Sequence, residues 1–143
     1  ENRFKLAEVF LFTSPGIPCV FYGDELGMDG DTESALRGPM PWERAGLGYS
    51  DFFRRLIALR KQNPVLTYGK FRLVRKNEAG LYIFSRSDEE EELIICLNNS
   101  AEKFDISADL QGGELLMQEG CTDQILGGMG YAILRRDLDQ GGE

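Results

Sequence analysis

The sequence predicts an α/β segment followed by an all-β domain, because its apolar residues are spaced in two different patterns. In the first 65 residues, helix-like stretches flank one short, continuously apolar run, a pattern typical of a parallel sheet covered by helices. Beyond that point, short apolar runs alternate with turn-forming residues, which is typical of an antiparallel sandwich or barrel. We therefore divide the chain into residues 1–65 and residues 66–143.

The α/β segment is expected to contain two helices, one strand and one long loop. Residues 3–14 are apolar on almost every face, which predicts a helix buried on most sides. Ile17–Tyr22 lacks alternation and predicts a strand buried on both faces. A loop rich in Gly, Asp and Pro runs from Gly23 to Gly48, and loops of that length are commonly functional. The second helix is expected to begin with Ser50 as its N-cap and to end at Asn63-Pro64.

The all-β domain is expected to contain six or more short strands. Turns rich in Gly, Asn and Asp separate its apolar runs at near-even intervals. The expected strands are Phe71–Val74, Leu81–Phe84, Leu93–Leu97, Phe104–Ile106, Leu115–Met117 and Tyr131–Leu134. The polar tail, Asp137–Glu143, is expected to be frayed.

The chain is acidic, with 24 Asp and Glu against 16 Lys and Arg and a formal net charge of −8. A surface of that sign repels phosphate backbones, so no nucleic-acid partner is expected. No apolar run approaches the roughly 20 residues that cross a bilayer, so no membrane partner is expected either. Glu1 begins without an initiator Met or a basic leader, and no signal peptide is visible.

The side-chain inventory excludes several kinds of catalysis. The chain has no histidine, which removes Ser-His-Asp and Cys-His mechanisms and the commonest zinc ligand. The acidic run Asp88–Glu92 lacks the Asp, Asn and Gly spacing of a cation loop, so we interpret it as a solvated turn. No metal site and no cofactor are expected.

The three cysteines, Cys19, Cys96 and Cys121, stand far apart in the sequence. Because Cys19 and Cys96 sit inside apolar runs, we expect buried free thiols instead of a disulfide. Free thiols favour a reducing compartment, and a cytoplasmic location is the expectation that follows.

One stretch of the chain, from Ser14 to Met28, resembles a known family. Its residues Ser-Pro-Gly-Ile-Pro-Cys-Val-Phe-Tyr-Gly-Asp-Glu-Leu-Gly-Met are similar to the segment that enters and leaves the eighth barrel strand in the α-amylase family of glycoside hydrolases. Arg37–Trp42 and Phe52–Pro64 match what usually follows there. The motif Tyr-Gly-Asp-Glu resembles the corresponding sequence of cyclomaltodextrinases, neopullulanases and maltogenic amylases more than that of oligo-1,6-glucosidases.

The resemblance implies that the chain is the C-terminal part of such an enzyme: the last unit of a (β/α)₈ barrel followed by an antiparallel β-sandwich. The implied activity is hydrolysis of α-glucosidic bonds in maltodextrins, cyclodextrins, pullulan or starch. Retaining cleavage needs two carboxyl groups about 5–5.5 Å apart, and the family carries these, with a third aspartate, upstream of residue 1. We therefore expect no catalytic residue here, no activity of the isolated chain, and a cleft-shaping role for Asp24 and Glu25.

Four residues are candidate substrate contacts: Tyr22, Glu33, Arg37 and Trp42. In relatives an Asp-Pro-x-x-Arg pattern reaches sugar hydroxyls in the cleft. Arg37 matches the Arg, and Glu33 occupies the acidic position, with Ser34 in place of the Pro. The alternative for this pair is an ordinary surface ion pair. Trp42 and Tyr22 would stack on a glucose ring or anchor the loop on the barrel rim.

Two other interpretations stay open. The sandwich could act alone as a carbohydrate-binding or structural module, which needs a pair of exposed aromatic side chains on one face, or the chain could belong to a non-catalytic relative. A barrel remnant without its neighbours would also leave large apolar side chains exposed to water, which costs about 1.5–3 kcal/mol of free energy for each side chain. We therefore expect an α-glucan oligosaccharide as partner of the parent enzyme, and a homo-oligomer formed through the exposed remnant.

Overall fold

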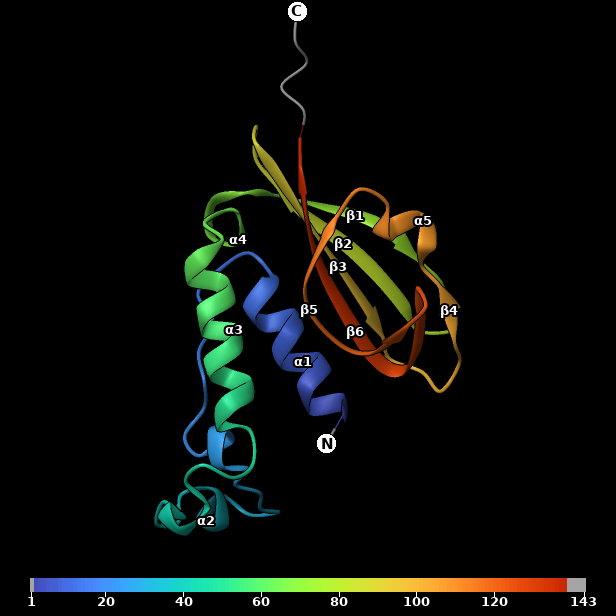
Figure 1. Cartoon of the computed structure of the whole chain (residues 1–143). Helices are drawn as coiled ribbons and strands as arrows, with labels where there is room; N and C mark the ends of the chain where they lie inside the picture. Colours follow the sequence, from blue (N-terminus) through green and yellow to red (C-terminus); the bar gives the residue numbers. More distant parts are fainter. Residues whose placement is uncertain (1, 139–143) are drawn as a thin grey trace, which may run out of the picture.

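The computed structural model describes residues 2–138, in which a layer of helices covers one face of an antiparallel sheet (Figure 1). Helix α1 lies between α3 and the sheet, and residues 21–49 form a lobe at the N-terminal end of α3, at the bottom of the view. The longer helices are α1 (Asn2–Thr13) and α3 (Ser50–Gln62), and the short ones are α2 (Glu33–Leu36), α4 (Val65–Tyr68) and α5 (Ser107–Leu110). Two 3₁₀ turns, η1 (Asp24–Leu26) and η2 (Trp42–Arg44), lie in the lobe.

All six expected strands are present. They are β1 (Lys70–Lys76), β2 (Leu81–Ser87), β3 (Glu91–Asn98), β4 (Phe104–Asp105), β5 (Glu114–Thr122) and β6 (Ile125–Asp137). The strands form one antiparallel sheet with the order β1-β2-β3-β6-β4, and β5 also pairs with β6. Because β6 pairs with β3, β4 and β5, it joins both halves of a sheet that curls into a half-barrel (Figure 1). The prediction of an antiparallel β-domain is confirmed.

Alternation along the central strands creates two apolar cores, one on each side of the sheet. On β3, Leu93 and Ile95 face the helices, whereas Ile94 and Cys96 face the opposite side. The helix-side core also contains Val9, Phe12, Phe53, Leu56, Leu66, Phe84 and Ile133. The second core contains Leu81, Ile83, Ile106, Leu126, Ala132 and Leu134. The helices of residues 1–65 and the sheet of residues 66–143 thus share one core, and the boundary between two units stays a prediction.

Helix α1 confirms the prediction for residues 3–14, but one side of it is left uncovered. Leu6, Val9 and Phe12 are buried against α3 and the sheet. Phe10 and Leu11 remain 43% and 37% exposed. The expectation of a helix buried on most sides is therefore met only on the face that the described residues can cover.

The strand expected at Ile17–Tyr22 is absent. Residues 17–20 have no regular secondary structure, and Ile17 is 96% exposed. A strand needs a neighbour to receive its hydrogen bonds, and none of the six described strands lies beside this segment. The same lack of cover explains why Cys19 is exposed, against expectation, whereas Cys96 is buried; all three cysteines are free. The barrel assignment of residues 1–65 stays a proposal.

The start of α3 also differs from its prediction. Tyr49 precedes the first helical residue, and no side chain caps the helix. The Ser50 hydroxyl donates instead to the carbonyl oxygen of Glu25 at 3.0 Å, which ties the helix to the lobe. The end of α3 is confirmed, because the helix stops at Gln62, just before Asn63-Pro64. The Asn63 side-chain amide donates to the Leu59 carbonyl oxygen at 2.7 Å and caps this end.

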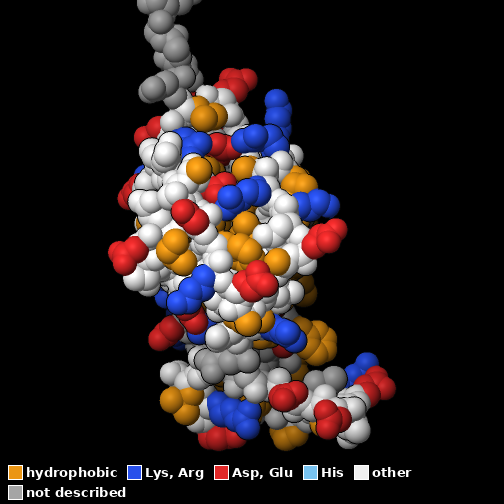
Figure 2. Space-filling model, turned by 90° about the vertical axis from the view of Figure 1, so that its right-hand side faces the viewer, with side chains coloured by type: hydrophobic (Ala, Val, Ile, Leu, Met, Phe, Trp, Pro, Cys, Tyr) orange, Lys and Arg blue, Asp and Glu red, His pale blue; other side chains and the backbone are white. Residues whose placement is uncertain are grey.

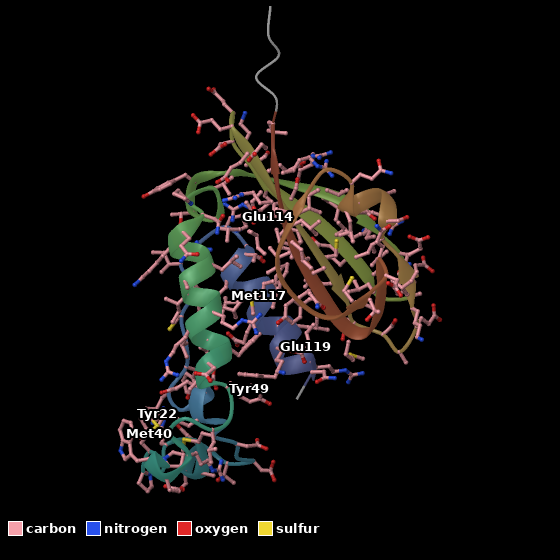
Figure 3. All side chains as sticks on the ribbon, in the orientation of Figure 1. Tyr22, Met40, Tyr49, Glu114, Met117 and Glu119 are labelled. Atoms are coloured by element: carbon pink, nitrogen blue, oxygen red, sulfur yellow. The ribbon has the colours of Figure 1, made fainter. Side chains whose placement is uncertain are left out.

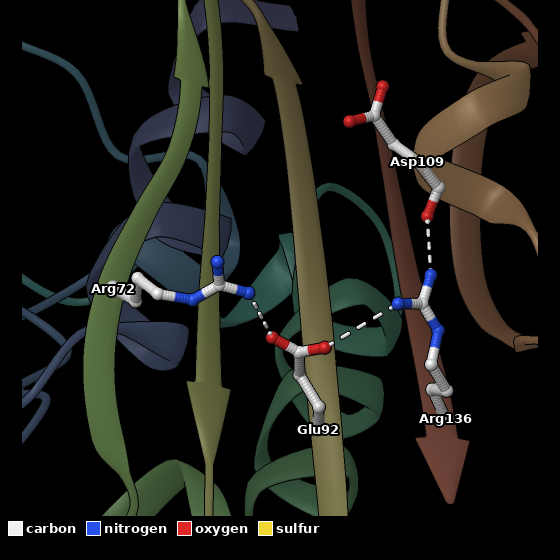
Figure 4. Close-up of polar contacts among 4 residues, drawn as sticks. All are labelled: Arg72, Glu92, Asp109 and Arg136. Carbon is white, nitrogen blue, oxygen red and sulfur yellow. Dashed lines mark hydrogen bonds and ion pairs between the residues drawn. The ribbon is translucent and has the colours of Figure 1, made fainter. Parts of the chain in front are cut away.

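An ion-pair network crosses the sheet (Figure 4). Glu92 on β3 accepts from Arg72 on β1 at 2.8 Å and pairs with Arg136 on β6 at 3.6 Å. Arg136 also donates to the Asp109 carbonyl oxygen at 3.2 Å. Burial opposes the charge of Glu92, but the hydrogen bonds of Arg72 and Ser85 and the charges of the two arginines outweigh it and hold the pKa of Glu92 below its usual range. The acidic run is therefore a solvated turn only at Asp88–Glu90, since Glu92 is buried and paired.

The outer surface around the sheet has no single character. On the face turned toward the viewer in Figure 2, positive and negative side chains are interspersed with separate hydrophobic ones. None of the helices within residues 2–138 has the length and apolarity needed to cross a bilayer. Most of the tail expected to be frayed, residues 139–143, lies outside the described residues.

Candidate functional site

The four sequence-predicted substrate contacts all lie in the lobe of residues 21–49 (Figures 1 and 3). Two hydrogen bonds to backbone carbonyl oxygens hold this lobe together and tie it to the start of α3. The Tyr49 N–H donates to the Glu25 carbonyl oxygen at 3.2 Å, and the Arg44 guanidinium donates to the Gly27 carbonyl oxygen at 3.1 Å. The lobe therefore has a defined shape, although it contains only short helical turns.

Tyr22 closes the lobe. Its hydroxyl donates to the carbonyl oxygen of Gly38 at 3.1 Å, and Figure 3 shows Tyr22 and Met40 together in the lobe, away from the sheet. Gly23 has a φ of +86°, and a Cβ at this position would lie 2.7 Å from the side chain of Met28. Only glycine satisfies both conditions without strain. The turn at Gly23 thus directs the chain so that Tyr22 meets the residue that follows Arg37.

Glu33, the first residue of α2, forms an ion pair with Arg37, which follows its last residue. Arg37 Nη2 lies 2.8 Å from Glu33 Oε1, one helical turn apart, and both side chains are about three-quarters exposed. The Thr32 hydroxyl accepts from the Ala35 N–H at 3.2 Å and caps this single turn. Because neither partner is buried, the pair contributes little to stability. It does present a carboxylate and a guanidinium side by side to solvent.

Trp42 begins η2 and is 70% exposed. An indole with this much exposed surface can stack on the apolar face of a sugar. The same exposure also fits a rim anchor whose rim lies outside the described residues. No contact described for this chain joins the side chain of Trp42 to those of Tyr22, Glu33 or Arg37, so the structure brings three of the four residues onto one closed loop and leaves the fourth beside it.

Two carboxylates, Glu8 on α1 and Asp24 in the lobe, have environments that the sequence did not indicate. Glu8, in the middle of α1, is only 8% exposed, and its Oε2 has no hydrogen-bond partner. Burial, and then the charge of Asp24, raise the pKa of Glu8. Burial also raises the pKa of Asp24. A hydrogen bond with the Phe21 backbone lowers this pKa in part, and the charge of Glu25 raises it further. Asp24 lies in the 3₁₀ turn η1. The sequence signal for Glu8 was an acidic residue between apolar positions of α1.

The hollows around the lobe differ in character. A small one of about 280 Å³ is lined by Phe4, Asp24, Gly27, Met28, Asp29 and Tyr49. A larger one of about 520 Å³ lies where the end of α1 and residues 17–20 meet α3, and it is mostly apolar. It is lined by Phe12, Ile17, Pro18, Val20, Ile57, Arg60, Lys61, Pro64, Thr67 and Tyr68. Within the described residues no group of three or more Asp, Glu, Cys or His could hold a metal ion.

Comparison with known proteins relates the chain to enzymes that act on α-glucans. It is 39% identical over 106 residues to neopullulanase 2 of Thermoactinomyces vulgaris, a match that covers 72% of this chain. It is 36% identical over 102 residues to an intracellular maltogenic amylase of Bacillus subtilis, covering 68% of this chain. The chain spans only 18% and 17% of the lengths of these two relatives.

The fold gives the same answer. The crystal structure of an α-amylase from Anoxybacillus superposes with a TM-score of 0.77 and 29% identity, over 99% of this chain and 33% of that one. No family model matches the chain. Both the helix-and-lobe segment and the sheet are included in that superposition, since nearly the whole chain is covered. By sequence and by fold, the chain belongs to the α-amylase family of glycoside hydrolases.

Proposed function

We propose that this chain is part of a glycosidase that hydrolyses α-glucosidic bonds in maltodextrins, cyclodextrins or pullulan. The observation that carries the proposal is the lobe: a chain related to neopullulanases and maltogenic amylases presents an exposed Glu33–Arg37 pair and an exposed Trp42 in one lobe. Charged groups of both signs can accept from and donate to sugar hydroxyls, while an open indole can cover a sugar ring. This combination suits an uncharged, hydroxyl-rich ligand.

In this proposal the chain supplies substrate contacts and not the reacting groups. Arg37 and Glu33 hold sugar hydroxyls, and Tyr22 fixes the loop on which they stand while its ring faces the cleft. The nucleophile and the acid/base come from the part of the enzyme outside this sequence. Residues 1–65 form the end of its barrel, and the sheet of residues 66–143 is the C-terminal domain that packs on it.

A sugar-binding role for the sheet alone is less well supported. That role needs two exposed aromatic rings on one face of the sandwich. Phe84 and Tyr131 are buried, and Phe71, 41% exposed, stacks on Phe84 with ring centroids 5.2 Å apart. Tyr68 is 86% exposed but lies in α4, outside the sheet. A lone stacked ring and a ring on a helix do not make a flat platform.

The isolated chain has a second proposed partner, another copy of itself. Ile17, Phe21 and Leu47 are 96%, 58% and 65% exposed, and the large apolar hollow lies beside Ile17. In the parent enzyme these groups would be covered by the rest of the barrel. A cytoplasmic location is also proposed, supported by the free thiols and by the name of the intracellular maltogenic amylase.

The function is tested with the parent enzyme and three substrates. Purified parent should release reducing sugar from maltoheptaose, a cyclodextrin and pullulan, and the sites of cleavage can be identified by chromatography. A parent that hydrolyses none of the three, while folded by circular dichroism, would contradict the proposal. A parent that binds them without cleavage would favour the non-catalytic relative.

A further inference from the structure

The C-terminal end of α1 is held by a buried arginine from the sheet. Arg86 lies on β2 and is 1% exposed. Its Nη1 donates to the carbonyl oxygens of Thr13 at 2.9 Å and Leu66 at 2.7 Å, and its Nη2 donates to that of Gly69 at 2.9 Å. One guanidinium therefore joins the end of α1, helix α4 and the residue that leads into β1.

A second arginine holds the residues that follow. Arg60, in the last turn of α3, donates through Nη1 to the carbonyl oxygens of Phe12 at 2.6 Å and Ser14 at 3.3 Å, and through Nη2 to that of Gly16 at 2.6 Å. Together, Arg60 and Arg86 take the carbonyl oxygens of residues 12, 13, 14 and 16. We refer to these two side chains as the arginine clamp.

The arginine clamp places two positive charges close together inside the protein. Burial, and then the charge of Arg60, lower the pKa of Arg86, and burial lowers the pKa of Arg60. The last carbonyl groups of a helix have no partner within it and carry a partial negative charge, which offsets this cost. All the described hydrogen bonds of both guanidiniums end on backbone carbonyl oxygens. The stabilisation therefore depends on where those carbonyl groups point.

The segment that runs from the clamp to the lobe has few other restraints. Among the described residues, none from 15 to 20 makes a backbone-to-backbone hydrogen bond. The next such bond joins the Asp24 N–H to the Phe21 carbonyl oxygen at 3.1 Å, at the turn beside Tyr22. Gly16 has a φ of +111°, so the chain changes direction sharply where Arg60 holds it. Without the bonds from Arg60, no described backbone hydrogen bond would hold the chain between Gly16 and the turn beside Tyr22.

We propose that Arg60 and Arg86 are positioning residues for the lobe: through them α3 and β2 set the direction in which residues 17–22 leave α1, and hence where the candidate substrate contacts lie. The consequence for catalysis rests on the proposed function. The clamp itself is a property of this chain and can be tested without any substrate.

A spin label on Cys19 reports the motion of the segment between clamp and lobe. Cys19 is exposed, and Cys121 is replaced by Ser to prevent a second label. Cys96 stays unlabelled because it is buried, and burial raises the pKa of its thiol to about 12. The variants are Arg60→Met and Arg86→Met. One control is Arg54→Met, an exposed arginine of α3. The other is Ile95→Val, which weakens the helix-side core but removes none of the described hydrogen bonds of the clamp.

Electron paramagnetic resonance should show faster motion of the label in both clamp variants and unchanged motion in both controls. Circular dichroism shows which variants are folded, and Arg60→Met keeps the test valid if Arg86→Met does not fold, because Arg60 is only partly buried. If the label moves no faster in folded Arg60→Met than in Ile95→Val at matched thermal stability, the clamp does not position the segment and the proposal is overturned.

The parent enzyme supplies the second readout. Arg60→Met should lower kcat/KM on an α-glucan by about tenfold to a hundredfold, the scale of a small misplacement of binding groups, and Arg54→Met should not. An active parent in which Arg60→Met keeps the wild-type kcat/KM would overturn the positioning role. A parent without α-glucan activity would instead contradict the proposed function, and the label on Cys19 would still decide whether the clamp exists.

Discussion

The hydroxyl of Tyr22 donates to the carbonyl oxygen of Gly38 at 3.1 Å, and this bond joins the two ends of the segment that carries Glu33 and Arg37. Both members of the ion pair are about three-quarters exposed, so the loop holds them in place without covering them. A binding loop requires this combination, because its contact groups must be oriented before the ligand arrives and must still be accessible to it.

Replacing Tyr22 with Phe removes the bond and keeps the ring. We expect faster hydrogen exchange at the amides of residues 33–38, with a local loss of about 0.5–1.5 kcal/mol, the usual net contribution of one hydrogen bond. Exchange in the sheet should not change. The measurement is hydrogen–deuterium exchange with mass spectrometry, and Tyr68→Phe is the matched control, because the Tyr68 hydroxyl makes no described hydrogen bond. Equal exchange of the loop in the two variants would contradict the closure.

Arg37→Ala in the parent enzyme should impair the use of substrate. A lost charge-assisted hydrogen bond to a sugar hydroxyl is worth about 1.5–3 kcal/mol, or roughly tenfold to a hundredfold in kcat/KM. Arg54→Ala is the control, since Arg54 also belongs to an exposed ion pair on a helix, with Asp51. If steady-state kinetics show the same small effect for both variants, Arg37 is an ordinary surface ion-pair residue.

The isolated chain of 143 residues should have no glycosidase activity, because the carboxyl groups that stabilise the transition state are proposed to lie outside it. The assay is release of reducing sugar from maltoheptaose or cyclodextrin by the purified chain. Asp24→Asn and Glu25→Gln variants serve as controls for a carboxylate pair within the lobe. Turnover that co-purifies with the chain and disappears in either variant would show that reacting groups are present after all.

The sheet could be predicted from the sequence because each strand and each turn is indicated by a few consecutive residues. Its strands are short apolar runs separated by turns of Gly, Asn or Asp, and successive residues such as Ile95 and Cys96 must face opposite sides of the sheet. The strand at Ile17–Tyr22 was predicted from the same kind of pattern and is absent, because a strand that is apolar on both faces depends entirely on neighbouring strands that the described residues do not include.

The candidate site was predictable only as residue types on a loop. The sequence indicated Glu33 and Arg37, and their helical spacing explains the ion pair that forms. The hydrogen bond from Tyr22 to Gly38 and the arginine clamp join residues 16 to 73 positions apart, and no local pattern encodes such contacts. Arg86 was visible only as a charged residue at the end of an apolar run, in a position where its strand turned out to be buried.

Glu8→Gln should stabilise the chain at neutral pH. Burial raises the pKa of Glu8 above its ordinary value near 4.5, so the folded state binds a proton more readily than the unfolded state. The free energy of unfolding therefore falls as the pH rises from that ordinary value through the raised pKa of the folded protein. The neutral amide removes this loss, so the variant should be more stable above that window and less dependent on pH within it.

Urea unfolding at several pH values from 4 to 8 measures this difference for Glu8→Gln and the wild type. Glu102→Gln is the control, because Glu102 is exposed. Asp24→Asn should act in the same direction as Glu8→Gln, since the charge of Asp24 also raises the pKa of Glu8. A Glu8→Gln profile parallel to that of the wild type would mean that Glu8 does not titrate in this window.

Ile17→Ser should weaken self-association of the isolated chain. Ile17 is 96% exposed beside an apolar hollow of about 520 Å³ that Val20, Ile57 and Tyr68 also line. Burying one large aliphatic side chain is worth about 1.5–3 kcal/mol, and in a two-fold dimer the same side chain is buried in both copies. The substitution should therefore raise the dissociation constant by at least tenfold. Sedimentation velocity over a range of concentrations measures this constant.

Leu115→Ser is the matched control for that substitution. Leu115 is 50% exposed but lies on β5, on the sheet and away from the hollow, so its loss removes an equally apolar group without touching the proposed interface. If the two variants weaken association equally, the chain associates through non-specific hydrophobic contacts and not through the surface around Ile17. If the wild-type chain is monomeric at all concentrations, the exposed apolar surface does not drive a homo-oligomer, and the proposed barrel is then the remaining candidate to cover it.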